Sequence, residues 1–304
     1  MTRLALVLCA FFFLSLPASA QFQCSMSVSS IDFGSIDPLR STTATAVGTV
    51  SVNCGLLGIF CPSIGFGSGG AASSPRRRLV GPNGAFLEYD LYRDSGYSVP
   101  YGSRDNPALG PPLAISLLNY SSPVYARLYR GAAIPQPGLY TATFTGADAY
   151  VDYGLTALLN CGLLTGRATT AFDVRARVES QCTVGAASLN FGTTGLIRQP
   201  IDATTNLSVH CTPGTPYRIT LGGGQSSAGS PTERRMRAAN GREVIYGLYR
   251  DPARTQGWGN TATTLLTGTG TGVSQSVPLY GRVPPQPTPP PAVYTDSVLV
   301  TIEY

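Results

Sequence analysis

The clearest pattern of hydrophobic and polar residues lies at the end of the chain, in residues 294–304. Its apolar side is formed by Tyr294, Val298, Val300, Ile302 and Tyr304. Its polar side is formed by Thr295, Ser297, Thr301 and Glu303. Alternation at period two is typical of a strand with one buried face, so this stretch predicts a single β-strand.

An earlier copy of this stretch lies at residues 140–150 and matches it without a gap, with tyrosine at both ends. The first copy is followed by a loop and by another alternating stretch, residues 171–178, whereas the second copy is followed by nothing. If both halves share one fold, we expect the second half to lack a strand that the first half has.

The match between the halves extends over most of the chain. The recurring blocks are Cys24 and Cys182, Phe33-Gly34 and Phe191-Gly192, Cys54 and Cys211, Arg77-Arg78 and Arg234-Arg235, Asn83-Gly84 and Asn240-Gly241, LYRD at 91–94 and at 248–251, Leu128-Tyr129 and Leu279-Tyr280, and PQP at 135–137 and at 285–287. Each half has the pattern of short strands separated by turns such as Asn-Gly. This pattern favours two all-β domains, each with seven antiparallel strands or fewer in two packed sheets.

The chain begins with a predicted signal peptide, residues 1–20. Arg3 precedes an apolar run, and the small residues Ala18, Ser19 and Ala20 form a cleavage site. We therefore expect the mature chain to leave the cytoplasm and to divide into domains at 21–180 and 181–304.

Six cysteines remain after cleavage, an even number that favours disulfide bonds in an oxidising compartment. The repeat predicts the pairs Cys24–Cys54 and Cys182–Cys211, which leaves Cys61 and Cys161 to pair with each other. A metal site is disfavoured because the chain has no CxxC pair and a single histidine, His210.

Charge and motifs exclude several function classes. All 21 basic residues are arginine, and their two clusters, at 76–78 and 234–235, are interpreted as solvated strand ends and turns. Nucleic-acid binding would need a basic stripe with interleaved aromatic residues. No hydrolase or zinc-protease motif is present, so we expect neither an enzyme nor a cofactor.

The cysteine spacing, the Phe-Gly strand ending, the LYRD block and the terminal YxDxVxVxxxY strand together resemble the spore coat protein U domain. That resemblance implies a building block of archaic chaperone–usher pili, in which each subunit is an immunoglobulin-like β-sandwich without its last strand. The strand is supplied by the N-terminal extension of the next subunit, which adds to an exposed sheet edge. The implied partners are a periplasmic pilus chaperone, an outer-membrane usher and an adjacent pilin subunit.

In this chain the stretch that resembles a donor extension is internal. Phe172, Val174, Ala176 and Val178 point to one side of a predicted strand at 170–179, which we expect to complete the first domain; an interdomain linker is the alternative. Only three residues precede Cys24 after cleavage, so the resemblance implies a subunit that accepts a strand without giving one, at the pilus tip on the cell surface. The residues expected to contact chaperone and donor are Val298, Val300, Ile302 and Tyr304.

Leucine-rich loops are predicted at the end of the first domain far from the second. The candidate surface-binding residues are Leu56, Leu57, Ile59, Phe60, Leu109, Leu113, Leu158, Leu159, Leu163 and Leu164. Because solvent-facing turns are normally polar, we expect these residues to bind an abiotic or host surface and to promote biofilm formation, although they could instead cover the core.

Two other functions remain open. Carbohydrate binding would use Tyr97, Tyr101, Arg104, Asp105 and Asn106. A structural role resembling that of a spore coat is the other alternative.

Overall fold

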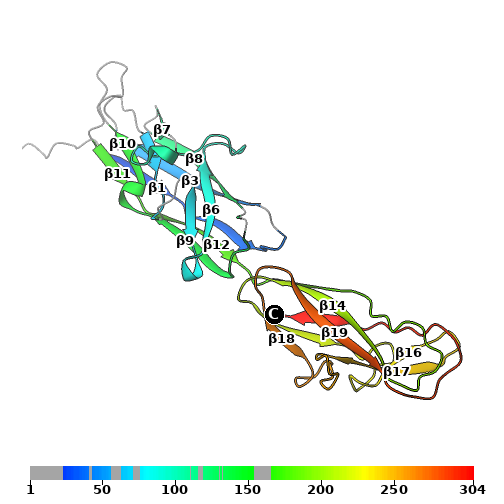
Figure 1. Cartoon of the computed structure of the whole chain (residues 1–304). Helices are drawn as coiled ribbons and strands as arrows, with labels where there is room; N and C mark the ends of the chain where they lie inside the picture. The colour runs from blue at the N-terminus through cyan, green and yellow to red at the C-terminus, as the bar shows by residue number, and fades with distance from the viewer. Residues whose placement is uncertain are drawn as a thin grey trace, which may run out of the picture.

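The computed structural model describes residues 23–40, 43–55, 63–70, 76–109, 111–115, 119–129, 131, 133–153 and 166–304. Figure 1 shows two elongated β-domains that follow one another end to end. The predicted signal peptide and the predicted Cys61–Cys161 bond lie outside the described residues. No helix in the described part of the chain has the length and apolar character of a membrane span.

The described residues of the first domain form twelve strands and three short 3-10 helices. The strands are β1 (Cys24–Val28), β2 (Ile31–Ile36), β3 (Thr43–Cys54), β4 (Ser63–Phe66), β5 (Arg77–Val80), β6 (Phe86–Tyr92), β7 (Leu113–Ala114), β8 (Asn119–Tyr129), β9 (Gly138–Phe144), β10 (Ala149–Tyr153), β11 (Gly166–Thr169) and β12 (Phe172–Val178). The helices are η1 (Pro82–Gly84), η2 (Pro107–Leu109) and η3 (Gly146–Asp148).

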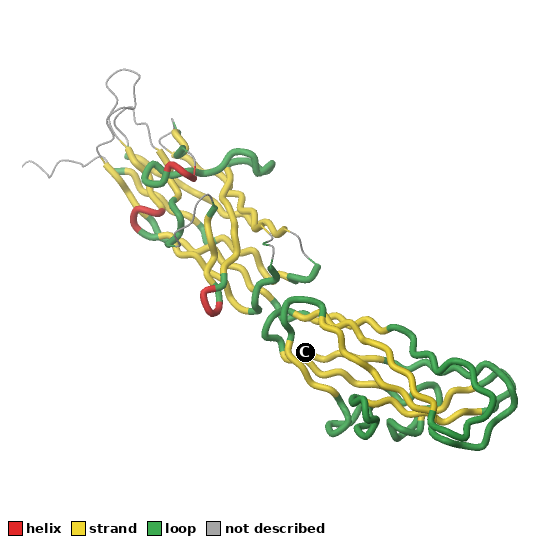
Figure 2. Tube along the Cα trace, in the orientation of Figure 1, coloured by secondary structure: helices red, strands yellow, loops and turns green. Residues whose placement is uncertain are grey.

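The second domain contains eight strands. They are β13 (Cys182–Ala186), β14 (Ile201–Cys211), β15 (Pro216–Leu221), β16 (Arg234–Arg237), β17 (Glu243–Tyr249), β18 (Leu266–Thr269), β19 (Gln275–Val283) and β20 (Val300–Glu303). Figure 2 shows that strands and loops account for nearly all of the traced chain.

Two sheets form each domain. In the first, the strand order is β1-β3-β8-β6-β5-β9-β12-β2 in one sheet and β11-β10-β4-β7 in the other. In the second, the orders are β13-β14-β19-β17-β16 and β18-β15-β20. All pairings are antiparallel except that of β12 with β2, which is parallel.

Each domain has its own hydrophobic core, and a disulfide ties its first strand to its first long strand. Cys24 faces Cys54 across β1 and β3 and is bonded to it, and Cys182 faces Cys211 across β13 and β14 and is bonded to it. These are the two bonds that the repeat predicts. No buried residue is shared between the two core clusters.

Strands that change sheets make the first domain more complex than the seven-strand sandwich expected from the sequence. After β11 has paired with β10 in one sheet, the chain crosses at Thr170 and Ala171 and pairs as β12 in the other. Similarly, β9 and β10 are separate strands in different sheets, joined by η3. A period-two pattern continues across such a crossing, so the alternation alone does not reveal it.

The prediction of one strand at residues 294–304 is therefore wrong. Thr295 forms an isolated bridge with Arg237, whereas β20 pairs with β15 in the other sheet. In the first domain Thr141 pairs with Val80 at the place of the Thr295 bridge.

The ungapped match of the two copies also fails in its second half. Ala149 faces Phe66, and its counterpart Val300 faces Leu221, so strand pairing matches Tyr153, rather than Tyr150, with Tyr304. The difference is a three-residue insertion in the first copy, where η3 lies.

A second block of the repeat is also out of register. Tyr125 faces Tyr92 in the first domain, and Tyr280 faces Tyr249 in the second. Tyr280 is therefore the counterpart of Tyr125, and the sequence match of Leu128-Tyr129 with Leu279-Tyr280 is displaced by four residues.

The interpretation of both arginine clusters as solvated is wrong for one member of each. Arg77 and Arg234 are 0% and 1% exposed. Arg77 donates to the backbone oxygens of Phe66, Gly67 and Tyr101 at 2.7 to 2.8 Å. Arg234 donates to those of Leu221, Gly222, Pro231 and Trp258 at 2.5 to 3.2 Å. Each guanidinium thus joins segments whose carbonyl groups would otherwise be buried without partners.

Candidate functional site

Strand β12 occupies the position that distinguishes the two domains. It lies between β9 and β2 and closes the large sheet of the first domain. Seven residue pairs join it to β9, from Phe172 opposite Phe144 to Val178 opposite Gly138. On its other side Val174 pairs with Ile31 and Val178 with Ile36.

The inner face of β12 fills the core of the first domain. Phe172, Val174, Ala176 and Val178 are at most 5% exposed, while the residues between them are exposed. The Phe172 ring stacks on Phe144 with centroids 4.4 Å apart and meets Phe66 edge to face at 5.5 Å. Burial of such side chains is the main source of stabilisation for an added strand.

The outer face of β12 is joined to its neighbours by polar side chains. Thr143 Oγ1 donates to Asp173 Oδ1 at 2.8 Å, Arg175 Nε donates to Asp32 Oδ2 at 2.9 Å, and Ser35 Oγ donates to Glu179 Oε1 at 2.7 Å. The backbone N–H of Gly34 lowers the pKa of Asp32, and Arg175 lowers this pKa further. These contacts match one register of β12, because a shift by one residue would turn the polar side chains into the core.

No strand lies at the corresponding position of the second domain, whose residues are all described. A groove of about 430 Å³ is found there instead. One wall is the segment 189–195, which follows β13 as β2 follows β1, and the other is the proline-rich segment 288–294 that leads to the Thr295 bridge. Its floor includes Ile201, Met236, Val244 and Val283.

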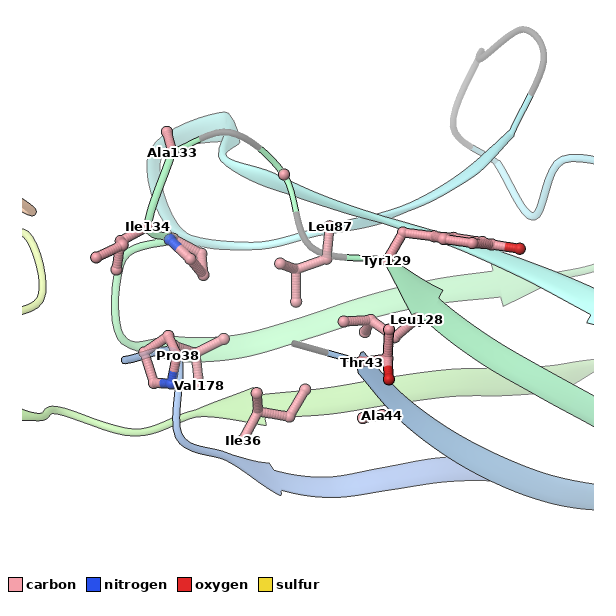
Figure 3. Close-up of a pocket in the computed structure, with 12 residues that line it drawn as sticks. Ile36, Pro38, Thr43, Ala44, Leu87, Leu128, Tyr129, Ala133, Ile134 and Val178 are labelled. Atoms are coloured by element: carbon pink, nitrogen blue, oxygen red, sulfur yellow. The ribbon is translucent and has the colours of Figure 1, made fainter. Parts of the chain in front are cut away.

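The equivalent place in the first domain is almost filled. Ala44 faces Leu128 as Ile201 faces Val283, and Leu79 faces Leu87 as Met236 faces Val244. Of these first-domain residues, Ala44, Leu87 and Leu128 line a hollow of only about 30 Å³ together with Val178 of β12. Figure 3 shows Val178 beside Pro38 and Ile36 in this hollow, with Leu87 and Leu128 facing it.

The four residues predicted to accept a strand are only partly buried. Val298, Val300 and Ile302 are half-buried, whereas Phe144, Ala149 and Val151 of the first domain are fully buried at the matching strand positions. Tyr304 is 55% exposed, and its hydroxyl donates to Gln181 Oε1 at 3.1 Å, next to the start of β13. The last residue therefore lies at the domain junction, where Figure 1 marks the C-terminus.

Sequence reasoning missed the residues that line the groove itself, namely Leu189, Phe191, Met236 and Val244. A signal was present, because the repeat places them at the positions of Ile31, Phe33, Leu79 and Leu87, which are all buried. The proline-rich wall has no such counterpart in the sequence.

The strand ends at the far end of the first domain lie together. Ser63 of β4 faces Asp152 of β10 and Ala114 of β7, while Tyr153 of β10 faces Gly166 of β11. Figure 1 shows β7, β10 and β11 at the end opposite to the second domain. Segments 56–62, 116–118 and 154–165 connect to these strand ends, and eight of the ten leucine-rich loop residues fall in segments outside the described residues.

The other two loop residues do not form an exposed patch. Leu109 is 5% exposed and belongs to η2, and Leu113 is half-buried in β7 opposite Ile64. The prediction of surface binding is thus wrong for Leu109 and is unsupported for Leu113. For Leu113, alternation could not reveal this, because its burial depends on the pairing of β7 with β4.

The five residues predicted to bind carbohydrate do not form one surface. Tyr101 is fully buried. Asp105 is bound by Arg167 at 2.6 Å, and Arg104 lies 3.5 Å from Asp152. The same Arg167 also donates to Asp152 at 2.6 and 3.0 Å, and its hydrogen bonds to Asp152 and Asp105 raise its pKa. This network joins β10 and β11 to the loop that carries Asp105.

No group of three or more potential metal ligands occurs among the described residues.

Comparisons with known proteins agree with the internal repeat. The sequence profile described as Spore Coat Protein U domain matches residues 10–147 and again residues 168–301. Protein U of Myxococcus xanthus is 35% identical over 152 residues, which cover 45% of this chain and 85% of that protein.

One of the solved structures compared shares the fold at low sequence identity. A chain in the crystal structure of the CsuC–CsuE chaperone–tip adhesion subunit pre-assembly complex, from archaic chaperone–usher Csu pili of Acinetobacter baumannii, aligns with a TM-score of 0.52 and 15% identity. The alignment covers 93% of this chain and all of the other. The CupB6 tip adhesin from Pseudomonas aeruginosa aligns over 92% of this chain and 94% of its own at 11% identity, with a TM-score of 0.37.

Two copies of one profile cover most of the chain, and the second copy begins ahead of β12, at residue 168. The chain therefore contains two copies of the spore coat protein U domain and belongs to the family that this domain defines.

Proposed function

We propose that this protein is the tip subunit of a chaperone–usher pilus, assembled by donor-strand complementation. In this proposal both domains are immunoglobulin-like sandwiches. The first is completed by β12 of its own chain, and the second is completed by a strand of the adjacent pilin subunit. The observation that carries the proposal is the contrast at one position, about 30 Å³ of space beside β12 and about 430 Å³ where no strand is present.

The family profile supports this assignment of β12. Its second match starts at residue 168 and so includes β12 ahead of Cys182, although β12 folds into the first domain. By sequence, therefore, β12 is the extension that precedes the second repeat. An extension that already fills a groove in its own chain is not free to fill one elsewhere, which favours the tip position.

The geometry also suggests the direction of the incoming strand. β12 runs antiparallel to β9 and ends with Val178 at the end of the first domain nearest the second. A strand with the same direction in the second domain would run from the domain junction toward the groove beside Met236 and Val244, and would leave at the end farthest from the first domain. Successive subunits would then follow one another along a fibre.

A covalently appended strand tests this proposal. A copy of residues 166–179 is attached after Tyr304 through a Gly/Ser linker as long as segment 154–165. We expect the second domain to unfold at a temperature higher by roughly 10 °C, because a few kcal/mol of added burial produces a shift of this size. Trp258, the only tryptophan, is fully buried in the second domain, so its fluorescence follows that transition alone.

The matched control carries serine in place of the four apolar residues of the appended copy. It should leave the transition where it is in the unextended chain. If the apolar copy also leaves it unchanged, no strand is accepted at this position and the proposed assembly is wrong.

The partners follow from the same groove. A periplasmic chaperone would cover it before assembly, contacting Val298, Val300 and Ile302, and an outer-membrane usher would exchange the chaperone for the next pilin. The Acinetobacter baumannii protein with the same fold was crystallised in a chaperone–tip adhesion subunit pre-assembly complex. The signal peptide at 1–20 would direct the chain to the periplasm, and assembly would carry it to the cell surface.

We further propose that the leucine-rich segments of the first domain bind abiotic or host surfaces and so promote biofilm formation. The support is that the strand ends flanking segments 56–62 and 154–165 meet at the end opposite to the second domain. A pilus tip would present this end to its surroundings. Apolar residues gathered there would bind by excluding water.

Adhesion assays on piliated cells test this role. Serine at Leu57, Phe60, Leu159 and Leu163 should leave pilus assembly intact and reduce attachment to polystyrene by at least tenfold. Serine at the partly exposed Val47 and Val99 gives the matched control, since these residues lie on the sides of the domain. Unchanged attachment of the fourfold variant would contradict the proposal.

A further inference from the structure

An aromatic patch with one central arginine lies on the outer face of the first domain. Its members are Tyr92 of β6, Tyr97 of the following loop, and Tyr125, Arg127 and Tyr129 of β8. The Tyr97 ring meets Tyr92 and Tyr125 edge to face, with centroids 5.7 and 6.4 Å away. The hydroxyls of Tyr92 and Tyr129 are hydrogen bonded to each other.

Arg127 lies between two of these rings. Its guanidinium carbon is 5.7 Å from the centroid of Tyr97 and 5.6 Å from that of Tyr129. Tyr97 reaches this place with a φ of 54°, a left-handed conformation that is unusual for a bulky residue. Such conformations persist where the surroundings hold them, and they occur often at binding sites.

The second domain has a different arrangement at the same place. Arg282 is the counterpart of Arg127, and its Nε and Nη2 bind Asp202 at 2.7 and 2.9 Å. Arg254, at the place of Tyr97 and with a φ of 59°, lies 3.2 Å from the same carboxylate. Asp202 faces Arg282 across β14 and β19, so both arginines of this face have an acidic partner within the domain.

In the first domain the residue opposite Arg127 across β3 and β8 is Thr45, which carries no charge. All 16 acidic residues of the chain are in the described part, and none of them forms an ion pair with Arg127. Asp90 faces Arg127 from β6, but its carboxylate binds Arg77. Arg127 is therefore a half-buried cation without an acidic partner.

The charge around the patch is positive as well. On β6, Glu88 is shared by Arg76 at 3.9 Å and Arg78 at 4.0 Å. Arg76 also lies over the Tyr129 ring at 3.8 Å. Asp90 is bound to the buried Arg77, so Glu88 is the one remaining carboxylate on β6 for Arg76, Arg78 and Arg127, which favours an anionic ligand of low charge density. A nucleic acid would need a longer basic stripe.

We propose that this patch binds an acidic polysaccharide. A sugar carboxylate would take the place that Asp202 has in the second domain and accept hydrogen bonds from Arg127, because the planar guanidinium binds carboxylates through two parallel hydrogen bonds. The pyranose ring would lie against Tyr97 and Tyr125, whose rings offer apolar surface and whose hydroxyls offer hydrogen bonds. This site lies on the side of the first domain and does not depend on strand exchange.

Calorimetric titration of the mature chain with tetragalacturonate tests the proposal. We expect saturable binding that falls at least tenfold in affinity in Arg127→Gln and in Thr45→Asp. The second variant supplies the carboxylate that the second domain already has, and Thr45 is exposed, so the fold should tolerate the change. Arg282→Gln, the matching change in the second domain, should leave binding unchanged.

The methyl ester of tetragalacturonate should bind at least tenfold more weakly, because it keeps the ring and loses the charge. Equal binding of the ester, or wild-type binding by folded Thr45→Asp and by Arg127→Gln, would overturn the proposal. An oligonucleotide of equal charge that binds more tightly than the sugar acid would also overturn it, in favour of a general anion site.

Discussion

At the scale of single residues, the two buried arginines are the most informative feature. Each belongs to a sequence cluster that looks solvated, yet it is enclosed and donates only to backbone oxygens or, for Arg77, also to Asp90. Arg234 has no acidic partner among the described residues, and burial lowers its pKa. A guanidinium can remain charged in such a place because its five donors can all be satisfied.

Replacement of Arg234 by methionine should strongly destabilise the second domain. The side-chain volume is partly retained, but the carbonyls of Leu221, Gly222 and Trp258 lose the hydrogen bonds that Arg234 donates, at a cost of roughly 1–3 kcal/mol for each buried group left unpaired. Chemical denaturation followed by Trp258 fluorescence measures the loss. Arg235→Gln is the matched control, since Arg235 is exposed and pairs with Glu243 on the surface. Equal midpoints for the two variants would contradict this role.

At the scale of elements, β12 belongs by sequence to the second repeat but is folded into the first domain. Its alternation predicts a strand with a buried face, and the structure buries that face in the first domain. Asp173, Arg175 and Glu179 form polar contacts with β9 and β2. These contacts specify the register of β12 more tightly than the burial of its apolar residues would do alone. By the repeat, Asn190 of the second domain is the counterpart of Asp32. A strand with the pattern of β12 would therefore have no acidic partner there for the residue equivalent to Arg175.

Val174→Asp should open the first domain and leave the second intact. Val174 is fully buried between Ala142 and Ile31, and an uncompensated charge at such a position costs about 4 kcal/mol or more. Calorimetry should then show one weakened transition, while the transition reported by Trp258 stays in place. The exposed neighbour offers the control, because Arg175→Ala removes only a surface ion pair. A simultaneous shift of both transitions would show that the domains are coupled.

At the scale of the whole molecule, two domains with separate cores should unfold independently. The linker between β12 and β13 comprises only residues 179–181, but both of its ends are bonded within a domain, since the N–H of Glu179 donates to Ile36 and that of Gln181 to Thr212. No buried residue belongs to both cores.

Removal of the second disulfide, by alanine at Cys182 and Cys211, should therefore affect one domain only. The bond closes a loop with a sequence separation of 29 residues, which corresponds to roughly 3–4 kcal/mol in the chain-entropy model. Trp258 fluorescence should report an earlier transition, with the calorimetric transition of the first domain unchanged. Alanine at Cys24 and Cys54 should give the opposite result. Loss of both transitions in either variant would contradict independent folding.

The sequence by itself determined the all-β class, the two repeats, the two described disulfides and the inward face of β12. These features follow from local alternation and from matching residues, which are properties of the chain alone. It did not determine where strands cross between sheets, because period two continues through a crossing. The division of residues 294–304 between two sheets follows from this.

Only the tertiary structure decided which polar side chains are buried and which apolar positions are open. Arg77 and Arg234 are enclosed because carbonyls from distant segments converge on them. Arg127 lacks a carboxylate because a residue on a neighbouring strand, Thr45, differs from its counterpart Asp202. The groove beside Val244 is empty because no strand lies there, although its floor is as apolar as that of the filled position. Each of these depends on what lies across the sheet, which the order of residues along the chain does not specify.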